Sequence, residues 1–396
     1  MSAGHAEEYG PSSIEALEGV EAVRRRPGMY VGSTGERGLY HLVCEATHRS
    51  VSEVLAGRAT TVDVTLTADG RVRVRDDGPG LPFEAAGHPG RPGLEALLTS
   101  TTARERPDDR HTVDLTRLGI GLIVVNALSS RLTAEVRRDG VHWAQEYARG
   151  VALAPPAPLG PATGTGTTLT FRPDPGVFPT ARCSRDALAD RFRELAFLNR
   201  PLALSLSDER PRDADGSDGA DGAVPGGTWH ERFDFPGGLR DYVAHLDARE
   251  GTPVRHPDVV HFEAEAPRMA GTVEVGLRWN DSREERVLGF ANSRATPEGG
   301  THLTGLREGI AAAVGAYARG RRLPAATDRA PGGTWTGAGL TAVVSVKLDR
   351  PEFQGATRSR LGGAVVHECV AELARERLGT WLEEHPEQAA AVVGRS

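Results

Sequence analysis

The sequence predicts an α+β fold built from two sandwich domains. A chain of 396 residues is long enough for two or three domains of ordinary size. In both halves, runs of alternating apolar and polar residues, as in antiparallel hairpins, are mixed with segments of helical spacing. Residues 207–228 are rich in Asp and Gly and are typical of an insert near a domain boundary. Helices mixed with hairpins in each half favour two α+β sandwiches.

The first half of the chain opens with a polar segment, residues 1–13, which is expected to form an extended arm. Pro27-Gly28 ends the short helix that follows this arm. Ala68-Asp69-Gly70 has the composition of a hairpin turn between two runs of alternating residues. The elements predicted before the insert are helices at 14–26, 38–55 and 119–128 and strands at 61–66, 71–75, 131–137, 142–147 and 167–172.

The second half repeats this mixture of helices and strands without any internal repeat of sequence. The predicted helices lie at 239–248, 301–318 and 364–384, and the predicted strands at 257–263, 272–279, 286–291 and 340–347.

Composition excludes several classes of protein. No apolar run approaches the ~20 residues that cross a bilayer, and no signal peptide precedes residue 14. A net charge of −7 argues against a protein whose whole surface coats nucleic acid. Cys44, Cys183 and Cys369 lie far apart, which excludes a disulfide scaffold and a cysteine zinc site. We therefore expect a protein of a reducing compartment, the cytoplasm, with no membrane partner.

Several short motifs are weak signals when taken singly. Asp76-x-Gly78-x-Gly80 after a strand is a turn, and most such turns bind nothing. Gly119-x-Gly121 before a helix could hold phosphate or could be a plain turn, and Glu45 could simply face solvent. Their order and spacing change this interpretation when they are taken with the other motifs: Ser12-Ser13-Ile14, Arg26-Pro27-Gly28-Met29-Tyr30-Val31-Gly32, Asp76-Asp77-Gly78-Pro79-Gly80, Thr165-Gly166-Thr167, Trp279-Asn280-Asp281 and Gly299-Gly300-Thr301-His302.

Together these motifs resemble the ATPase region of the gyrase B protein, in the GHKL family that includes Hsp90, MutL and histidine kinases. The likeness covers almost the whole chain. It implies an ATP-binding α/β sandwich followed by a ribosomal-S5-like transducer domain. On this resemblance, residues 1–13 are the arm, 14–228 the ATP-binding domain with its insert, and 229–396 the transducer domain.

The resemblance also implies roles for individual residues. Asp76 matches the aspartate that accepts a hydrogen bond from the adenine amine, and Thr167 matches the threonine that supports it. Glu45 matches the general base that activates water, with His41 one helical turn earlier. The other positions matched to the nucleotide site are Gly78, Gly80, Gly119, Gly121, Arg138 and Tyr9. Tyr9 would lie on the arm that embraces the partner of a homodimer, although a free tail is the alternative.

The sequence departs from the family pattern at the expected magnesium ligand. The family has an asparagine there, four residues after the glutamate, whereas this chain has Arg49. A guanidinium group has no acceptor and cannot bind a metal ion, so Mg²⁺ is not expected as a cofactor even though ATP or another adenine nucleotide is. Arg49 also lies one helical turn from Glu45, where it would lower the pKa of that carboxyl group and weaken it as a base.

Two further departures lie where the family holds phosphate. The glycine-rich run of the lid is replaced by residues 114–118, Asp-Leu-Thr-Arg-Leu, whose side chains restrict the turn. The Gln-Thr-Lys loop of the second domain reads Ala356-Thr357-Arg358, so Arg358 keeps the positive charge. Pro79 replaces an arginine that would pair with Glu53. These changes favour a degenerate ATPase that binds a nucleotide or another anionic small molecule with weak or no hydrolysis.

Two alternatives stay open. One is a working, ATP-hydrolysing gate of a type IIA topoisomerase, with DNA or another gyrase protein as partner. The other is a pocket adapted to secondary-metabolite biosynthesis or antibiotic self-resistance, since Asp76 and Arg138 match positions that line the aminocoumarin pocket. The sequence shows no DNA-cleavage motifs before Ser396, so we expect that this chain alone does not break DNA. It is either an excised fragment or a natural stand-alone protein, and the altered site favours the second.

Overall fold

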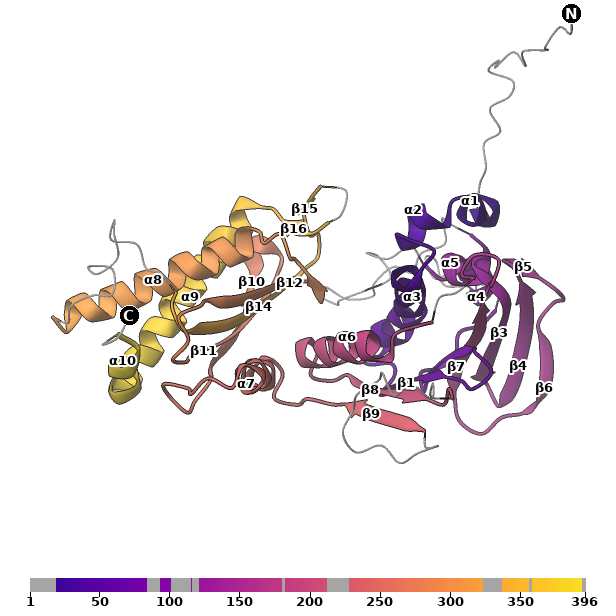
Figure 1. The fold of residues 1–396 in the computed structure, drawn as a ribbon, viewed down its shortest axis with the longest axis horizontal. Helices are drawn as coiled ribbons and strands as arrows, with labels where there is room; N and C mark the ends of the chain where they lie inside the picture. The colour runs from indigo at the N-terminus through magenta and orange to yellow at the C-terminus, as the bar shows by residue number, and fades with distance from the viewer. Residues whose placement is uncertain are drawn as a thin grey trace, which may run out of the picture.

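The structure is a computed structural model that describes residues 19–83, 93–100, 115, 121–179, 182–211, 228–322, 337–355 and 358–393. In it, two mixed α/β units follow one another along the chain, each with its own sheet (Figure 1). The α+β class expected from the sequence is therefore confirmed. Among the described helices, none combines the length and the apolar composition needed to cross a membrane.

The first unit is a sheet with helices on one face. Within the described residues the sheet has nine strands in the order β5-β4-β3-β7-β2-β1-β8-β9, with β6 also beside β4. Its strands are β1 (Thr61–Leu66), β2 (Val72–Asp76), β3 (Ser129–Arg138), β4 (Val141–Ala148), β5 (Val151–Ala152), β6 (Ala157–Pro161), β7 (Gly166–Pro173), β8 (Ala203–Asp208) and β9 (Trp229–Phe233). Its helices are α1 (Gly19–Arg25), α2 (Pro27–Val31), α3 (Glu36–Leu55), α4 (Leu94–Thr99), α5 (Leu122–Ala127) and α6 (Arg185–Leu198).

The hairpin of β1 and β2 shows how the sequence produces this sheet. Alternating residues in both strands are buried, so that each strand turns one apolar face to α3. The strands pair antiparallel, with Val62 opposite Asp76, and Gly70 takes a left-handed conformation (φ 80°) in the turn. The predicted hairpin is confirmed, and it places Asp76 at the C-terminal end of β2.

The second unit is a sheet covered on both faces. Its five strands within the described residues run in the order β10-β11-β14-β12-β13, with α7 on one face and the paired helices α8 and α9 on the other (Figure 1). The strands are β10 (Val260–Ala266), β11 (Gly271–Trp279), β12 (Arg286–Ala291), β13 (Arg294–Ala295) and β14 (Leu340–Leu348), with a separate ribbon of β15 (Phe353–Gln354) and β16 (Arg360–Leu361). The helices are α7 (Leu239–Glu250), α8 (Thr301–Gly320), α9 (Ala364–Glu384) and α10 (Pro386–Val393), with a 3₁₀ turn, η3 (Pro267–Met269).

The two units are joined by a small apolar core of their own. Phe197 at the end of α6 stacks on Tyr242 of α7, with 4.7 Å between ring centroids. Asn199 donates to the Ser293 hydroxyl at 3.0 Å, and Arg191 donates to the Ser293 carbonyl at 3.1 Å. These contacts bring the outer side of α6 against the start of β13, where the two units enclose a cavity.

The observed elements also differ from the expected ones in places. The helix expected at 119–128 is α5, Leu122–Ala127, and residues 119–120 lie outside the described residues. The segments that form α6 and β8 received no predicted element. Strand β9 pairs with β8 and belongs to the first sheet, although it follows the expected boundary at residue 228. The expected arm, residues 1–13, and most of the insert also lie outside the described residues.

Candidate functional site

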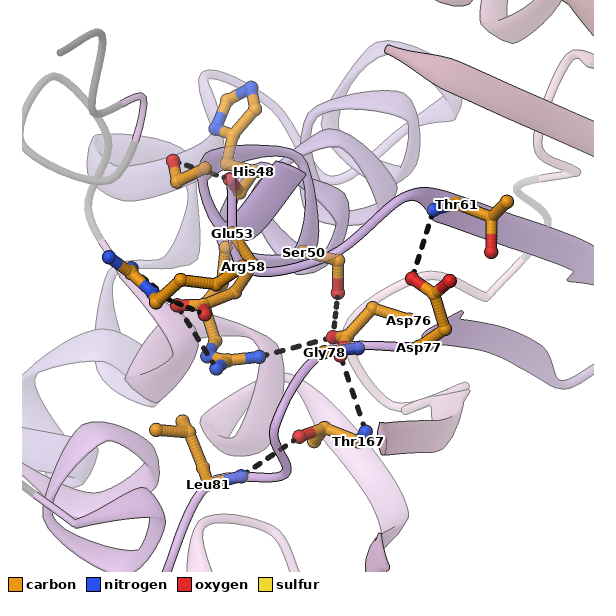
Figure 2. A network of polar contacts seen from close by, with 12 residues as sticks. His48, Ser50, Glu53, Arg58, Thr61, Asp76, Asp77, Gly78, Leu81 and Thr167 are labelled. Atoms are coloured by element: carbon orange, nitrogen blue, oxygen red, sulfur yellow. Dashed lines mark hydrogen bonds and ion pairs between the residues drawn. The ribbon is translucent and has the colours of Figure 1, made fainter. Parts of the chain in front are cut away.

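Asp76 is buried at the end of β2, between α3 and β7. It is 2% exposed, and its carboxylate accepts four hydrogen bonds. Oδ2 accepts from Ser50 at 2.8 Å and from Arg49 at 3.1 Å. Oδ1 accepts from the backbone N–H groups of Gly78 at 3.1 Å and Thr167 at 3.3 Å. Figure 2 shows the labelled Ser50, Gly78 and Thr167 around this carboxylate. Since two carboxylate oxygens offer about four lone-pair directions, these donors saturate Asp76.

Arg49 is a buried cation that lies between two buried carboxylates, those of Asp76 and Glu53. It projects from α3, is 3% exposed, and pairs with both Asp76 and Glu53, whose Oε1 lies 3.4 Å from its Nη2. Glu53 in turn accepts two hydrogen bonds from Arg58, at 2.8 and 2.9 Å. In the family, an arginine at the position of Pro79 would pair with Glu53. In this chain Arg49 and Arg58 pair with Glu53 instead. Each buried charge has an opposite neighbour, which offsets the free energy lost on removing it from water.

The effect that we expected Arg49 to have on the pKa of Glu45 stays a prediction, but the structure shows further partners for Arg49. Helical spacing put Arg49 beside Glu45, but in the structure Arg49 forms ion pairs with Asp76 and Glu53. Spacing alone could not choose, because Arg49 lies four residues from both glutamates. The pair with Asp76 spans 27 residues and forms only through the packing of α3 on β2.

The turn after Asp76 is fixed by backbone and side-chain contacts. Gly80 has a φ of 72°, and a Cβ on it would lie 2.5 Å from the carbonyl oxygen of Arg137, so only glycine fits without movement. The Thr167 hydroxyl accepts from the N–H of Leu81 at 3.2 Å (Figure 2). Arg138 donates to the carbonyl of Gly80 at 3.0 Å. Gly78, Gly80, Thr167 and Arg138 are thus brought together around Asp76.

Glu45 and His41 lie on another side of α3, away from the strands. The Glu45 carboxylate accepts a hydrogen bond from the N–H of Gly121 at 3.1 Å, and Gly121 precedes α5 with a φ of 98°. Nδ1 of His48 is 3.6 Å from the other carboxylate oxygen. Burial, and then the charge of Arg37, lower the pKa of His41, so this imidazole is neutral at pH 7. A carboxylate oriented by a backbone N–H beside a neutral histidine is suited to accept a proton.

A cavity of about 690 Å³ opens in front of Glu45, between the two units. Its walls include Glu45 and His41 of α3, Arg191 and Glu194 of α6, and Arg294 and Ser359 of the second unit. Arg358 directly precedes Ser359 and is exposed. The cavity therefore brings the expected base together with Ser359, which follows the expected phosphate-binding loop, and with arginines that sequence reasoning missed, among them Arg191 and Arg294. No motif marked Arg294, because it begins a strand of only two residues, which has no pattern of its own.

Some of the expected site positions have no structural description. Tyr9, Gly119 and the lid segment 116–118 lie outside the described residues, as do Ala356 and Thr357. Their roles stay predictions.

The comparisons with known proteins agree with this architecture. Residues 34–176 match the family of histidine kinase-, DNA gyrase B- and HSP90-like ATPases, and residues 238–396 match the DNA gyrase B family. The 43K ATPase domain of Thermus thermophilus gyrase B, solved with an aminocoumarin, is 32% identical, with a TM-score of 0.76 over 95% of this chain and 93% of that one. This chain belongs to the DNA gyrase B family.

Two full-length relatives show how much of the family protein is present. The novobiocin-sensitive gyrase B protein of Streptomyces niveus is 40% identical over 98% of this chain and 58% of its own length. The gyrase B protein of Streptomyces coelicolor is 42% identical over 97% of this chain and 56% of its own length. The chain thus spans less than three fifths of these relatives, and its two units are the gyrase-B-like ATPase and transducer domains.

The residues present do not fit the magnesium ion that the family implies. Arg49 stands in the ligand position and is held by two carboxylates. An adenine amine could donate to Asp76 only if one of the four present donors moved away, because all four lone-pair directions of this carboxylate are already used.

Proposed function

We propose that this chain is a gyrase-B-like nucleotide-binding protein whose pocket has lost most or all ATP hydrolysis. The observation that carries the proposal is the pairing of Arg49 with Asp76 and Glu53. It fills the metal-ligand position with a cation and at the same time occupies the aspartate expected to bind adenine. One substitution therefore alters both ends of the expected nucleotide site.

The proposed ligand is an adenine nucleotide or another anionic small molecule. Gly78 and Gly80 on the turn after β2, together with Asp76 and Thr167 of β7, support a shaped floor for the ligand. The cavity between the units supports a charged end. An aminocoumarin is a candidate ligand because Arg138 and Asp76 lie together at the floor, and the similar Thermus domain was solved with one. We also propose that the chain forms a cytoplasmic homodimer through residues 1–13. DNA or another gyrase protein is its proposed binding partner.

A working ATPase gate is the second candidate, and one observation favours it. Glu45 accepts a hydrogen bond from the Gly121 N–H and faces the cavity with neutral His41, which is an arrangement that can orient water. The base would then be intact, and only the charge that stabilises the phosphates would have changed.

A steady-state ATPase assay with and without Mg²⁺ separates the two functions. We expect turnover at least ~100-fold below that of the similar Thermus ATPase domain, since positioned acid–base catalysis contributes ~10²–10⁴. Arg49→Asn, which restores the family's residue, should raise the rate and make it depend on Mg²⁺. Arg73→Asn, an exposed arginine of β2, is the matched control and should change neither. Rapid, Mg²⁺-dependent hydrolysis by the unmodified chain would favour the ATPase gate.

A further inference from the structure

The sheet of the first unit has one face that none of the described helices covers. Helices α3, α5 and α6 pack on the other face, where alternate residues of the strands are buried and mostly apolar (Figure 1). The residues between them, on β1, β2, β3 and β7, point away from these helices and form what we call the open face. Its charged and hydroxyl residues include Asp63, Thr65, Arg75, Arg131, Thr133, Glu135, Thr168, Thr170 and Arg172.

Two arginines of the open face lie directly opposite each other on neighbouring strands. Arg131 of β3 pairs in register with Arg172 of β7, and both side chains are exposed. Like charges in this position destabilise a sheet. Within the described part of the chain neither guanidinium group forms an ion pair, and the same holds for exposed Arg75 on β2. The fold therefore keeps a repulsion that an anion from outside would offset.

The carboxylates near these arginines are engaged elsewhere or lie at the margin of the open face. Asp63 accepts a hydrogen bond from Ser205 of β8 at 2.6 Å. Glu135 pairs with His142 of β4 at 2.9 Å, and it lies four residues along β3 from Arg131, roughly 13 Å away. Exposed Glu146 of β4 is opposite Thr133 and bounds the positive strip on that side. The strip around Arg131 and Arg172 is therefore locally positive, although the whole chain carries a net charge of −7.

The side chains of the open face match the backbone of a double-stranded nucleic acid. Arginine and the hydroxyl groups of threonine and serine are common donors to phosphate oxygens. On this face of β1, β2, β3 and β7 there is no aromatic side chain, whereas proteins that bind single strands stack the bases on aromatic rings. A duplex presents one negative charge per about 1.7 Å, so it suits a flat positive surface without base-stacking groups.

We propose that the open face, around Arg131 and Arg172, binds the phosphate backbone of duplex DNA. This inference rests on the proposed function, in which DNA is a candidate partner, and it names the surface that the DNA contacts. The binding is independent of base sequence, because arginine and threonine side chains on a sheet reach phosphates and not base edges here. It is also weak and sensitive to salt, because the rest of the chain is acidic.

Fluorescence anisotropy of a labelled DNA duplex, titrated with the whole chain at several salt concentrations, tests the proposal. We expect a dissociation constant of about 10⁻⁶–10⁻⁴ M, the range of sequence-independent binding. The double variant Arg131→Ala/Arg172→Ala should bind about 10-fold more weakly and should lower the slope of log K against log salt by about 2, since each lost phosphate contact removes about 0.9. Arg131→Lys/Arg172→Lys keeps both charges and should keep the slope.

The matched control is Arg240→Ala/Arg377→Ala, which removes two exposed arginines of α7 and α9 in the second unit. It changes the net charge equally and should bind as the unmodified chain does. Equal weakening in the control, an unchanged salt slope in the Arg131/Arg172 variant, or no binding at low salt would overturn the proposal. Tighter binding of single-stranded DNA, or of polyglutamate at equal charge, would also overturn it and assign the face to another partner.

Thermal melting shows whether the two alanines disturb the fold, and removal of a like-charge pair should leave the melting temperature unchanged or higher. The ATPase assay contains no DNA, so the two proposals fail separately. Rapid hydrolysis of ATP would contradict the proposed function and leave the DNA titration unaffected, whereas absence of DNA binding would leave the nucleotide site as it is.

Discussion

The floor around Asp76 and the cavity in front of Glu45 both adjoin helix α3, but their charges are arranged in opposite ways. At the floor, Arg49 is 3% exposed and lies between Asp76 and Glu53, so every charge meets its opposite. In the cavity, Arg294 is half-buried, and burial and then the charges of Arg358 and Arg191 lower its pKa. The first arrangement stabilises the protein itself, whereas the second is suited to hold an anion from outside.

The largest effect expected from this contrast is the loss of stability in Asp76→Asn. The variant leaves Arg49 buried with one fewer countercharge, and breaking a buried pair costs about 3–5 kcal/mol of unfolding free energy. Urea denaturation measures it. Asp69→Asn is the matched control, because Asp69 pairs with Arg71 on an exposed turn, where solvent screens the charges and removal of a pair changes the stability little. Equal stability of the two variants would show that the floor does not depend on the Arg49 pair.

The sequence was sufficient for the elements that frame these regions. The alternation of 61–66 and 71–75 predicted the hairpin of β1 and β2, and apolar spacing predicted α3 to within two residues. Motif order then brought Asp76, Thr167 and Glu45 to one domain, as the family resemblance implied. These features depend on local pattern, which one chain displays directly.

The charge partners could not be predicted in the same way. Arg49 has glutamates four residues away on both sides, so helical spacing left its partner undecided, and Asp76 reaches it only across the packed interface of α3 and β2. Arg294 was missed because it lines the same cavity as Glu45 only when the second unit packs on α6 through Phe197 and Tyr242. Contacts between segments far apart in the sequence form both the Arg49–Asp76 pair and the cavity that Arg294 lines. The spacing of apolar residues along the chain does not reveal such contacts.

The next effect concerns the choice of base. Because Asp76 has no lone-pair direction left for an amine, we expect the intact chain to bind ATP and GTP with affinities within about tenfold of each other, a hydrogen bond contributing about 1 kcal/mol. Arg49→Asn should free an acceptor on Asp76 and widen the preference for ATP by about tenfold. Competition titration in EDTA measures the ratio. A preference for ATP above ~100-fold in the unmodified chain would show that Arg49 leaves Asp76 when nucleotide binds.

The smallest expected effect is the response of each region to salt. Screening shortens from about 10 Å at 0.1 M to about 3 Å at 1 M salt, and it acts on exposed charges far more than on buried pairs. Binding of a nucleotide in the open cavity, whose walls include Arg191 and half-buried Arg294, should therefore weaken several-fold between 0.1 and 0.5 M NaCl. The stability difference between the unmodified chain and Asp76→Asn should not change over the same range, because Arg49 and Asp76 are both buried. Titration measures the response of binding to salt, and urea denaturation measures that of stability. Stability that depends on salt together with binding that does not would contradict the assignment of a buried ion pair to Arg49 and of anion binding to the cavity.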